Sequence, residues 1–301
     1  MSQAGITRGI LGPLLAIPVL FGALYPLQRR IDRQEQTVQQ QKEELLLRSG
    51  PLLKKLSLGY EPLLADIYWT RAVQYYGGKR RDQDPNLELL DTLLDVTVTL
   101  DPQLVVAYKF GAIFLAEPSP QGAARPDLAV RLVRRGIAAN PDEWRFWADL
   151  GFTYYWYLQD YTNATDAYLQ GSKHPKAPLW MKTMAARIAA EGASREVSRA
   201  LWSQIFEATQ DPIIRRNAAE HLDSLAAQED IDQLEKFAAK YASRTGHFPR
   251  SMGELVAAGL LRSIPLDPAG HAYVLGPEGK AHLDSSSPIK LDILKPRAHP
   301  Q

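Results

Sequence analysis

Four pairs of residues that end in proline divide the middle of the chain into units of similar length. The prolines are Pro102, Pro141, Pro175 and Pro212, which lie 39, 34 and 37 residues apart. Between them, apolar residues recur at spacings of three and four, which is typical of helices that bury one face. Proline ends a helix because it lacks a backbone N–H and clashes with the preceding turn. The period therefore predicts a mainly α fold, an α-solenoid with a helix pair in each unit.

The unit that begins at Trp144 shows the pattern of each pair most clearly. Its first helix carries Trp147, Leu150, Gly151 and Tyr154, and its second carries Ala164, Tyr168 and Gly171 before Pro175. This pattern resembles the tetratricopeptide repeat family, in which small residues let two helices approach closely and large residues fill the opposing grooves. We expect this repeat domain to cover residues 51–243, with units at about 60–102, 103–141, 142–175 and 176–212 and a degenerate fifth helix pair at about 213–243.

The resemblance also implies a binding surface, because the first helix of each unit lines a concave groove in that family. The implied groove positions are Lys109, Arg145, Phe152, Tyr155, Trp156 and Lys182. Five of the six residues 152–157 are aromatic, and consecutive helical residues point about 100° apart, so one stripe cannot bury them all. Two interpretations follow: the aromatic residues bind a partner, or they are covered by the stalk, the tail or a second copy.

The N-terminal segment is an uncharged run of 19 residues, Gly9 to Leu27. That length matches the hydrocarbon core of a bilayer and predicts a single transmembrane helix, with the anchor at residues 1–28. A cleaved signal peptide is the alternative, but its apolar region is shorter and is followed by a small-x-small site, which is absent here. The polar, proline-free segment after the anchor predicts a helical stalk at residues 29–50.

The C-terminal segment, residues 244–301, differs from the repeat domain in its residue pattern. It predicts a small α+β module with a loose tail. Ser251 and Glu254 have capping-box spacing, Gly259 predicts the end of that short helix, and residues 273–275 can pair with 281–283 as a hairpin. About 40 residues of this segment resemble the C-terminal end of major pseudopilins of the general secretion type. The N-terminal methylation signature of that family, Phe-Thr-Leu-Ile-Glu, is missing, so the chain is not interpreted as a pilin subunit.

Composition and motifs exclude several classes of function. Lys and Arg number 35 against 34 Asp and Glu, which provides no electrostatic basis for nucleic-acid binding. The absence of cysteine removes thiolate catalysis, disulfides and thiolate metal sites. Nucleotide-binding, zinc-protease and serine-hydrolase motifs are absent, and the histidines are scattered. We therefore expect no enzymatic activity, cofactor, metal or small-molecule substrate.

The remaining function is interaction with other proteins. The sequence predicts a membrane-anchored scaffold or adaptor that holds a peptide or helix in the repeat groove and contacts the membrane through residues 9–27. The alternative is a subunit of a secretion or pilus-type envelope assembly, which the C-terminal resemblance implies. One Lys or Arg precedes the anchor and Arg29, Arg30 and Arg33 follow it, which favours a cytoplasmic domain. A long domain can be translocated despite so small a difference in charge. We therefore expect the domain after the anchor to lie on the exoplasmic or periplasmic side, with the cytoplasmic side as the alternative.

Overall fold

The computed structural model describes Pro26 and residues 49–291. Apart from Pro26, the predicted anchor lies outside the described residues, as do most of the stalk and the last part of the tail. Within the described part, no helix is both long and apolar enough to cross a membrane. The chain divides into two compact units, residues 1–56 and 57–301, and the first contributes helix α2 (Gly50–Leu56).

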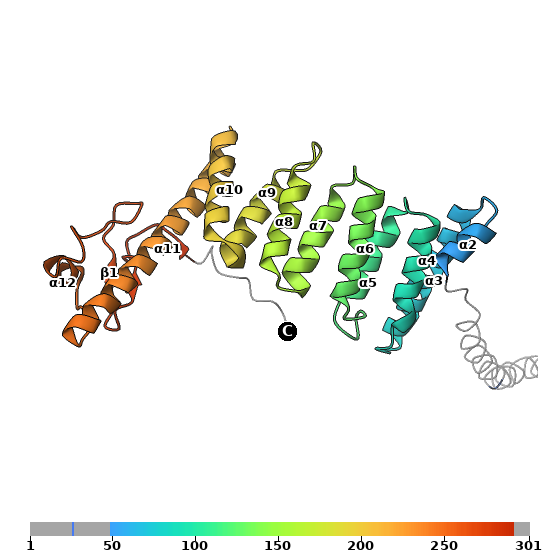
Figure 1. Cartoon of the computed structure of the whole chain (residues 1–301), viewed down its shortest axis with the longest axis horizontal. Coiled ribbons are helices and arrows are strands. Elements are labelled where there is room, and N and C mark those ends of the chain that lie inside the picture. The colour runs from blue at the N-terminus through green and yellow to red at the C-terminus, as the bar shows by residue number, and fades with distance from the viewer. Residues whose placement is uncertain (1–25, 27–48, 292–301) are drawn as a thin grey trace, which may run out of the picture. The chain divides into compact units, whose positions relative to one another are not determined.

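The second unit is mainly helical, as the sequence predicts. In Figure 1 its helices lie in a row, and each packs against the next along the chain from α5 to α11. The helices α3 and α4 form a further packed pair at the start of the row. The bounds are α3 (Glu61–Arg81), α4 (Glu88–Leu100), α5 (Val105–Ala116), α6 (Pro126–Ala139), α7 (Arg145–Phe152), α8 (Tyr161–Ser172), α9 (Trp180–Ile188), α10 (Arg195–Ala208) and α11 (Pro212–Thr245).

The helix boundaries fall where the sequence carries prolines and capping residues. Pro102, Pro141 and Pro175 all lie between helices, and Pro212 occupies the first turn of α11. The side chain of Asp211 caps that helix by accepting from the backbone N–H of Ile213 at 2.8 Å. The predicted breaks are therefore confirmed, and proline both ends one helix and opens the next.

Glycines mark the points where neighbouring helices approach most closely. A Cβ added at Gly151 of α7 would lie 2.7 Å from Cδ2 and Cε2 of Tyr168 on α8. A Cβ at Gly136 of α6 would lie 3.1 Å from the ring of Tyr108 on α5, and Gly171 of α8 would meet Trp147 of α7 at 2.6 Å. The predicted role of the small residues, to let a large side chain lie against a backbone, is confirmed.

The helix pair predicted at about 213–243 does not form, and this prediction was wrong. A single helix of 34 residues, α11, spans the region and ends at Gly246, whose φ of 82° is left-handed. The physical reason is the absence of proline and glycine between Pro212 and Gly246, which leaves no residue to interrupt the helix. A second departure is that α7 and α9 both end in a wide π-helical turn, η1 (Thr153–Tyr157) and η2 (Ala189–Ala193).

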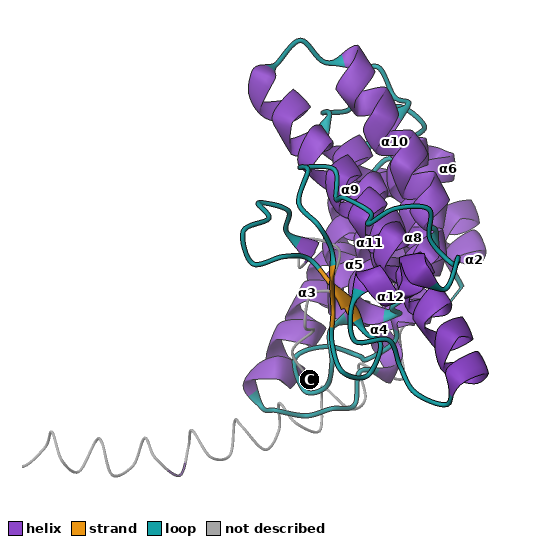
Figure 2. Ribbon diagram, turned by 90° about the vertical axis from the view of Figure 1, so that its left-hand side faces the viewer, coloured by secondary structure: helices purple, strands orange, loops and turns teal. Residues whose placement is uncertain are grey.

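The C-terminal segment folds onto the second half of α11. It consists of α12 (Met252–Ala257) and a hairpin of β1 (Val274–Leu275) and β2 (Ala281–His282), and Figure 2 shows how short these strands are. Val274 pairs with His282 and Leu275 with Ala281, which confirms the predicted hairpin.

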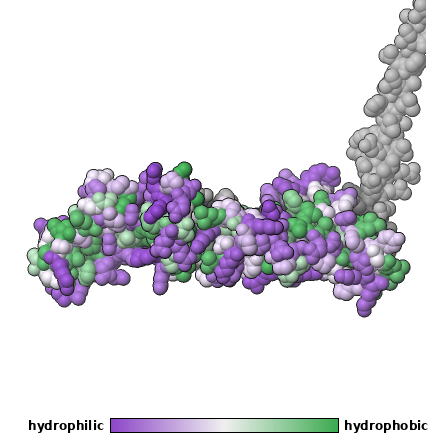
Figure 3. Space-filling view, turned by 90° about the horizontal axis from the view of Figure 1, so that it is seen from above, coloured by the Kyte–Doolittle hydropathy of each residue, from purple (hydrophilic) through white to green (hydrophobic). Residues whose placement is uncertain are grey.

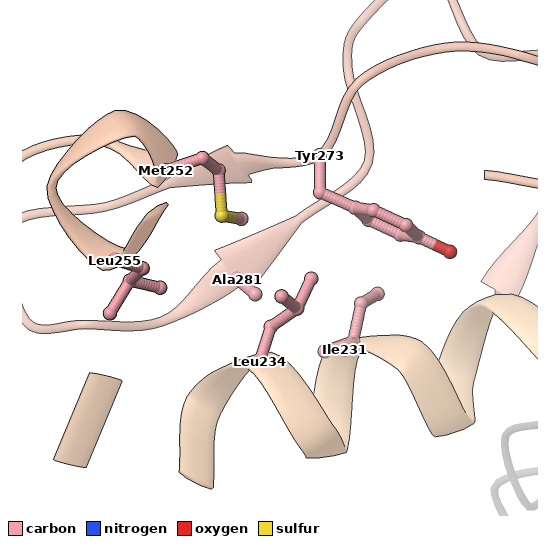
Figure 4. Packing of buried hydrophobic residues seen from close by; sticks show 6 residues of the cluster. All are labelled: Ile231, Leu234, Met252, Leu255, Tyr273 and Ala281. Carbon is pink, nitrogen blue, oxygen red and sulfur yellow. The ribbon is translucent and has the colours of Figure 1, made fainter. Parts of the chain in front are cut away.

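A small apolar core joins this module to α11. Ile231 and Leu234 of α11 point toward the module, and the buried residues that meet them are Met252, Leu255, Tyr273 and Ala281 (Figure 4). The hydroxyl of Tyr273 donates to Oδ2 of Asp230 at 2.8 Å. The Ser251 side chain does not cap α12, contrary to the predicted capping box; Glu254 instead accepts from the backbone N–H of Arg250 at 3.1 Å.

We predict that Gly151→Leu destabilises the helical unit. The new side chain would overlap the ring of Tyr168, and overpacking of this kind costs about 1–3 kcal/mol or more. Thermal unfolding followed by circular dichroism measures the effect as a lower Tm. The control is Gly77→Leu in α3, where an added Cβ meets no atom within 4 Å. Equal Tm values for the two variants would contradict the assigned helix contact.

Candidate functional site

The six groove positions predicted from the sequence lie on the first helices of three successive helix pairs, α5, α7 and α9, and on the π-helical turn η1 that follows α7. Lys109 is half-buried on α5, and Arg145 is exposed at the start of α7. Phe152 ends α7, Tyr155 and Trp156 follow in η1, and Lys182 is half-buried on α9. All six therefore belong to the first helix of a pair or to its π-helical extension. Of the six, Phe152 and Trp156 stack on each other, whereas Lys109 and Lys182 are 73 positions apart in the sequence, on α5 and α9.

The aromatic run 152–157 divides into an exposed and a buried part. Phe152 is 45% exposed and stacks on Trp156, with ring centroids 6.0 Å apart and 9° between the planes. Tyr154 and Tyr155 are buried. The wide turn η1 separates the two sets, since a π-helix bonds residue i to i+5 and so changes the angle between successive side chains. Leu158 donates in this way to the carbonyl of Thr153 at 3.3 Å.

Tyr155 belongs to a buried polar cluster. Its hydroxyl donates to Oε2 of Glu191 in η2 at 2.7 Å, and Nε of Arg187 donates to Oε1 of the same carboxylate at 3.0 Å. Burial, together with the hydrogen bond to Glu191, raises the pKa of Tyr155 to about 12. The 5% exposure of Tyr155 places it out of reach of a partner, unlike Phe152.

A histidine that lies near Arg187 extends this cluster to the last helices of the row. The ring of His221 on α11 stacks on Trp202 of α10, with centroids 4.1 Å apart. Burial lowers the pKa of His221 to about 4, and the positive charge of Arg187 acts in the same direction. The imidazole is therefore neutral at physiological pH, and its role is to pack α10 against α11.

The cationic positions differ in their surroundings. Arg145 forms an ion pair with Glu143, with 3.1 Å between Nη1 and Oε1, and its guanidinium lies 5.0 Å from the centre of the Trp144 ring. Lys109 lies near Asp149, the acidic residue of α7, and its charge opposes the effect of burial on that carboxyl. Burial nevertheless raises the pKa of Asp149 to about 6, and its Oδ2 is buried without a hydrogen-bond partner.

Several residues of this region were not identified from the sequence. Phe110, beside Lys109 on α5, is 50% exposed. Asp149 is a partly buried carboxyl, and Arg187 and Glu191 form a partly buried ion pair. The sequence does single out Asp149, because it is the one acidic residue in the mostly apolar segment 145–152. Glu191 has a local partner in Arg187, four residues earlier, but its second partner, Tyr155, is 36 residues away and gives no local signal. On the face drawn in Figure 3, hydrophobic residues form separate patches among hydrophilic ones.

Neither a metal site nor a match to another protein indicates what this region does. Within the part of the chain that the structure describes, no three His, Asp or Glu side chains are grouped so that they could hold a metal ion. The chain matches no protein-family model and no curated protein.

We predict that Asp149→Asn stabilises the protein at neutral and alkaline pH. The folded pKa of about 6 exceeds the ordinary 3.8, so the folded chain binds the proton more tightly than the unfolded chain. The free energy of unfolding therefore falls as pH rises from about 4 to 6, by up to about 3 kcal/mol. Denaturant unfolding at pH 4 and pH 8 should show a gain for the variant at pH 8 that disappears at pH 4.

The comparison with wild type isolates this effect, because His221 contributes the opposite slope in both proteins. Asp166→Asn, which changes an exposed carboxylate on α8, is the matched control and should show no gain at pH 8. A gain of the same size at both pH values would mean that the ionisation of Asp149 does not destabilise the fold.

Proposed function

We propose that this chain is a membrane-anchored scaffold or adaptor that binds other proteins through tetratricopeptide-like helical repeats. The observation that carries the proposal is the recurrence of exposed, large apolar side chains on the first helices of successive pairs. Phe110 and Ile113 of α5 and Phe152 of α7 are all exposed, and Lys109 and Lys182 lie on the same set of helices. Aromatic anchors beside cations are typical of surfaces that bind a peptide or a helix.

The helical architecture supports this proposal. Helices paired in sequence pack each against the next, and the first helices α5 and α7 also contact each other. Repeat proteins build extended binding surfaces from first helices arranged in this way. The alternative proposal, a subunit of a secretion or pilus-type envelope assembly, draws on the hairpin of β1 and β2 that follows a short helix in the C-terminal module. Purification of the intact chain from membranes separates the two: diverse clients support an adaptor, and one stoichiometric assembly supports a subunit.

We predict that Phe152→Asp weakens capture of the partner by about tenfold or more, since a central aromatic anchor is worth about 2 kcal/mol. The measurement is the amount of partner recovered with full-length chain from membranes. The matched control is Val197→Asp, whose side chain is similarly exposed on the second helix α10. Tm values confirm that both variants fold. Equal recovery by the two variants would remove Phe152 from the binding surface.

We also predict that removal of residues 1–28 releases the protein from membranes. The reason is the loss of the uncharged 19-residue run, which alone is long enough to cross the hydrocarbon core. Fractionation after carbonate extraction measures the result. If the shortened chain remains in the membrane pellet, the anchor assignment is wrong or a second membrane contact exists.

A further inference from the structure

The first helix of the row, α3, exposes an apolar stripe on the side that faces away from its neighbours. The buried side packs toward the following helices and consists of Ala65, Tyr68, Ala72 and Tyr76. On the opposite side, Tyr60 at the N-cap is 67% exposed, Leu63 is 57% exposed and Ile67 is 42% exposed. A helix that is apolar on both sides is normally covered on both sides. The outer side of α3 therefore needs an occupant.

The spacing of this stripe is that of a coiled-coil seam. Its apolar members are Tyr60 at the N-cap, Leu63 and Ile67, and the polar residues Thr70 and Gln74 continue the same spacing; all five are exposed. The intervals of three, four, three and four residues alternate as they do between a and d positions of heptads, so a second helix can pack along them with knobs in holes. We call these five residues the α3 seam.

The charges beside the α3 seam identify the second helix as another copy of α3. Asp66 and Arg71 occupy the g and e positions, five residues apart, on opposite flanks. In a parallel pair in register, a g residue faces the e residue five positions later on the other helix. Asp66 of each copy would therefore meet Arg71 of the other, which gives two reciprocal ion pairs. An antiparallel pair would place like flanks together, with Asp66 against Asp66.

Both charged groups are available for such a contact. Within residues 49–291, neither Asp66 nor Arg71 forms an ion pair. The guanidinium of Arg71 lies 5.9 Å from the centre of its own Tyr68 ring, which leaves its donors for another carboxylate. Two exposed, opposite charges that form no ion pair within the described residues are what a reciprocal contact between copies requires.

We propose that the chain forms a parallel, twofold-symmetric homodimer through the α3 seam, with reciprocal Asp66–Arg71 pairs at its flanks. The seam residues at a and d flank the symmetry axis, so each of them faces its own counterpart across it. A parallel pair also places the N-terminal ends of both α3 helices on the same side, as two copies anchored in one membrane require. This contact is separate from the surface around Phe152, and either can exist without the other.

The lack of cysteine allows a direct test in the full-length chain in its membrane. Ile67→Cys should form a disulfide dimer on oxidation, because facing a positions lie within disulfide reach. Leu63→Cys should also cross-link with itself. Gln204→Cys, an exposed position on α10, is the control for random encounters and should give no dimer. Cross-linking of Leu63→Cys only with Gln74→Cys would indicate an antiparallel pair and overturn the proposal.

Charge exchange provides the second test. Asp66→Arg alone and Arg71→Asp alone should each weaken dimerisation by about tenfold, since both reciprocal contacts become repulsive. The double variant Asp66→Arg/Arg71→Asp restores opposite charges and should recover the dimer. Sedimentation of the solubilised full-length chain measures the association, and Tm values confirm folding.

Three results would overturn the proposal. The first is a monomeric chain that gives no Ile67→Cys dimer, which is expected if lipid or the chain's own stalk covers the α3 seam. The second is a dimer yield from Gln204→Cys equal to that from Ile67→Cys. The third is a double variant Asp66→Arg/Arg71→Asp that does not recover the dimer. Capture of a partner through Phe152 is measured separately, so failure here leaves the proposed function unaffected.

Discussion

Close contact between helix backbones and large side chains determines the architecture of the helical unit. Gly111, Gly136, Gly151 and Gly171 lie on four successive helices, α5 to α8, and each lies against a large side chain of a neighbouring helix. Because a Cβ at Gly151 would come within 2.7 Å of Tyr168, only glycine permits that spacing. The row of first helices, and with it every exposed side chain proposed to bind a partner, depends on these contacts.

The same close packing sets the chemistry of the polar groups between the helices. Glu191 is fully desolvated, yet Tyr155 and Arg187 satisfy both of its oxygens. Asp149 lacks such partners for Oδ2, and burial raises its pKa to about 6. A buried carboxylate is tolerated as an anion when a cation and a hydrogen-bond donor reach it, and it retains its proton when they do not. The elevated pKa of Asp149 is therefore a consequence of burial without a full set of hydrogen-bond donors.

Local signals predicted much of the fold, and the failures have a common cause. The proline breaks, the glycine contacts and the C-terminal hairpin depend on residues close together in the sequence or on one repeated pattern. The long helix α11 and the turns η1 and η2 were missed. Residues 213–245 contain no breaker, and the expectation of a fifth pair extended the repeat beyond its local evidence. Both wide turns coincide with contacts between elements, since Tyr155 of η1 lies edge-on to Tyr161 of α8 and Gly192 of η2 lies against the same Tyr161 ring.

The sequence by itself determined that the chain is mainly helical, where its helices break, and which small residues touch a neighbour, because helix periodicity and chain stiffness are local properties. It also placed six candidate residues on the first helices of three pairs. Only the tertiary structure decided which of them can meet a partner. Phe152 is exposed and Tyr155, three positions later, is buried, because the η1 turn and the carboxylate of Glu191, 36 residues further along the chain, hold the tyrosine inside. Burial depends on what packs against a residue, and that is decided by contacts between distant parts of the chain.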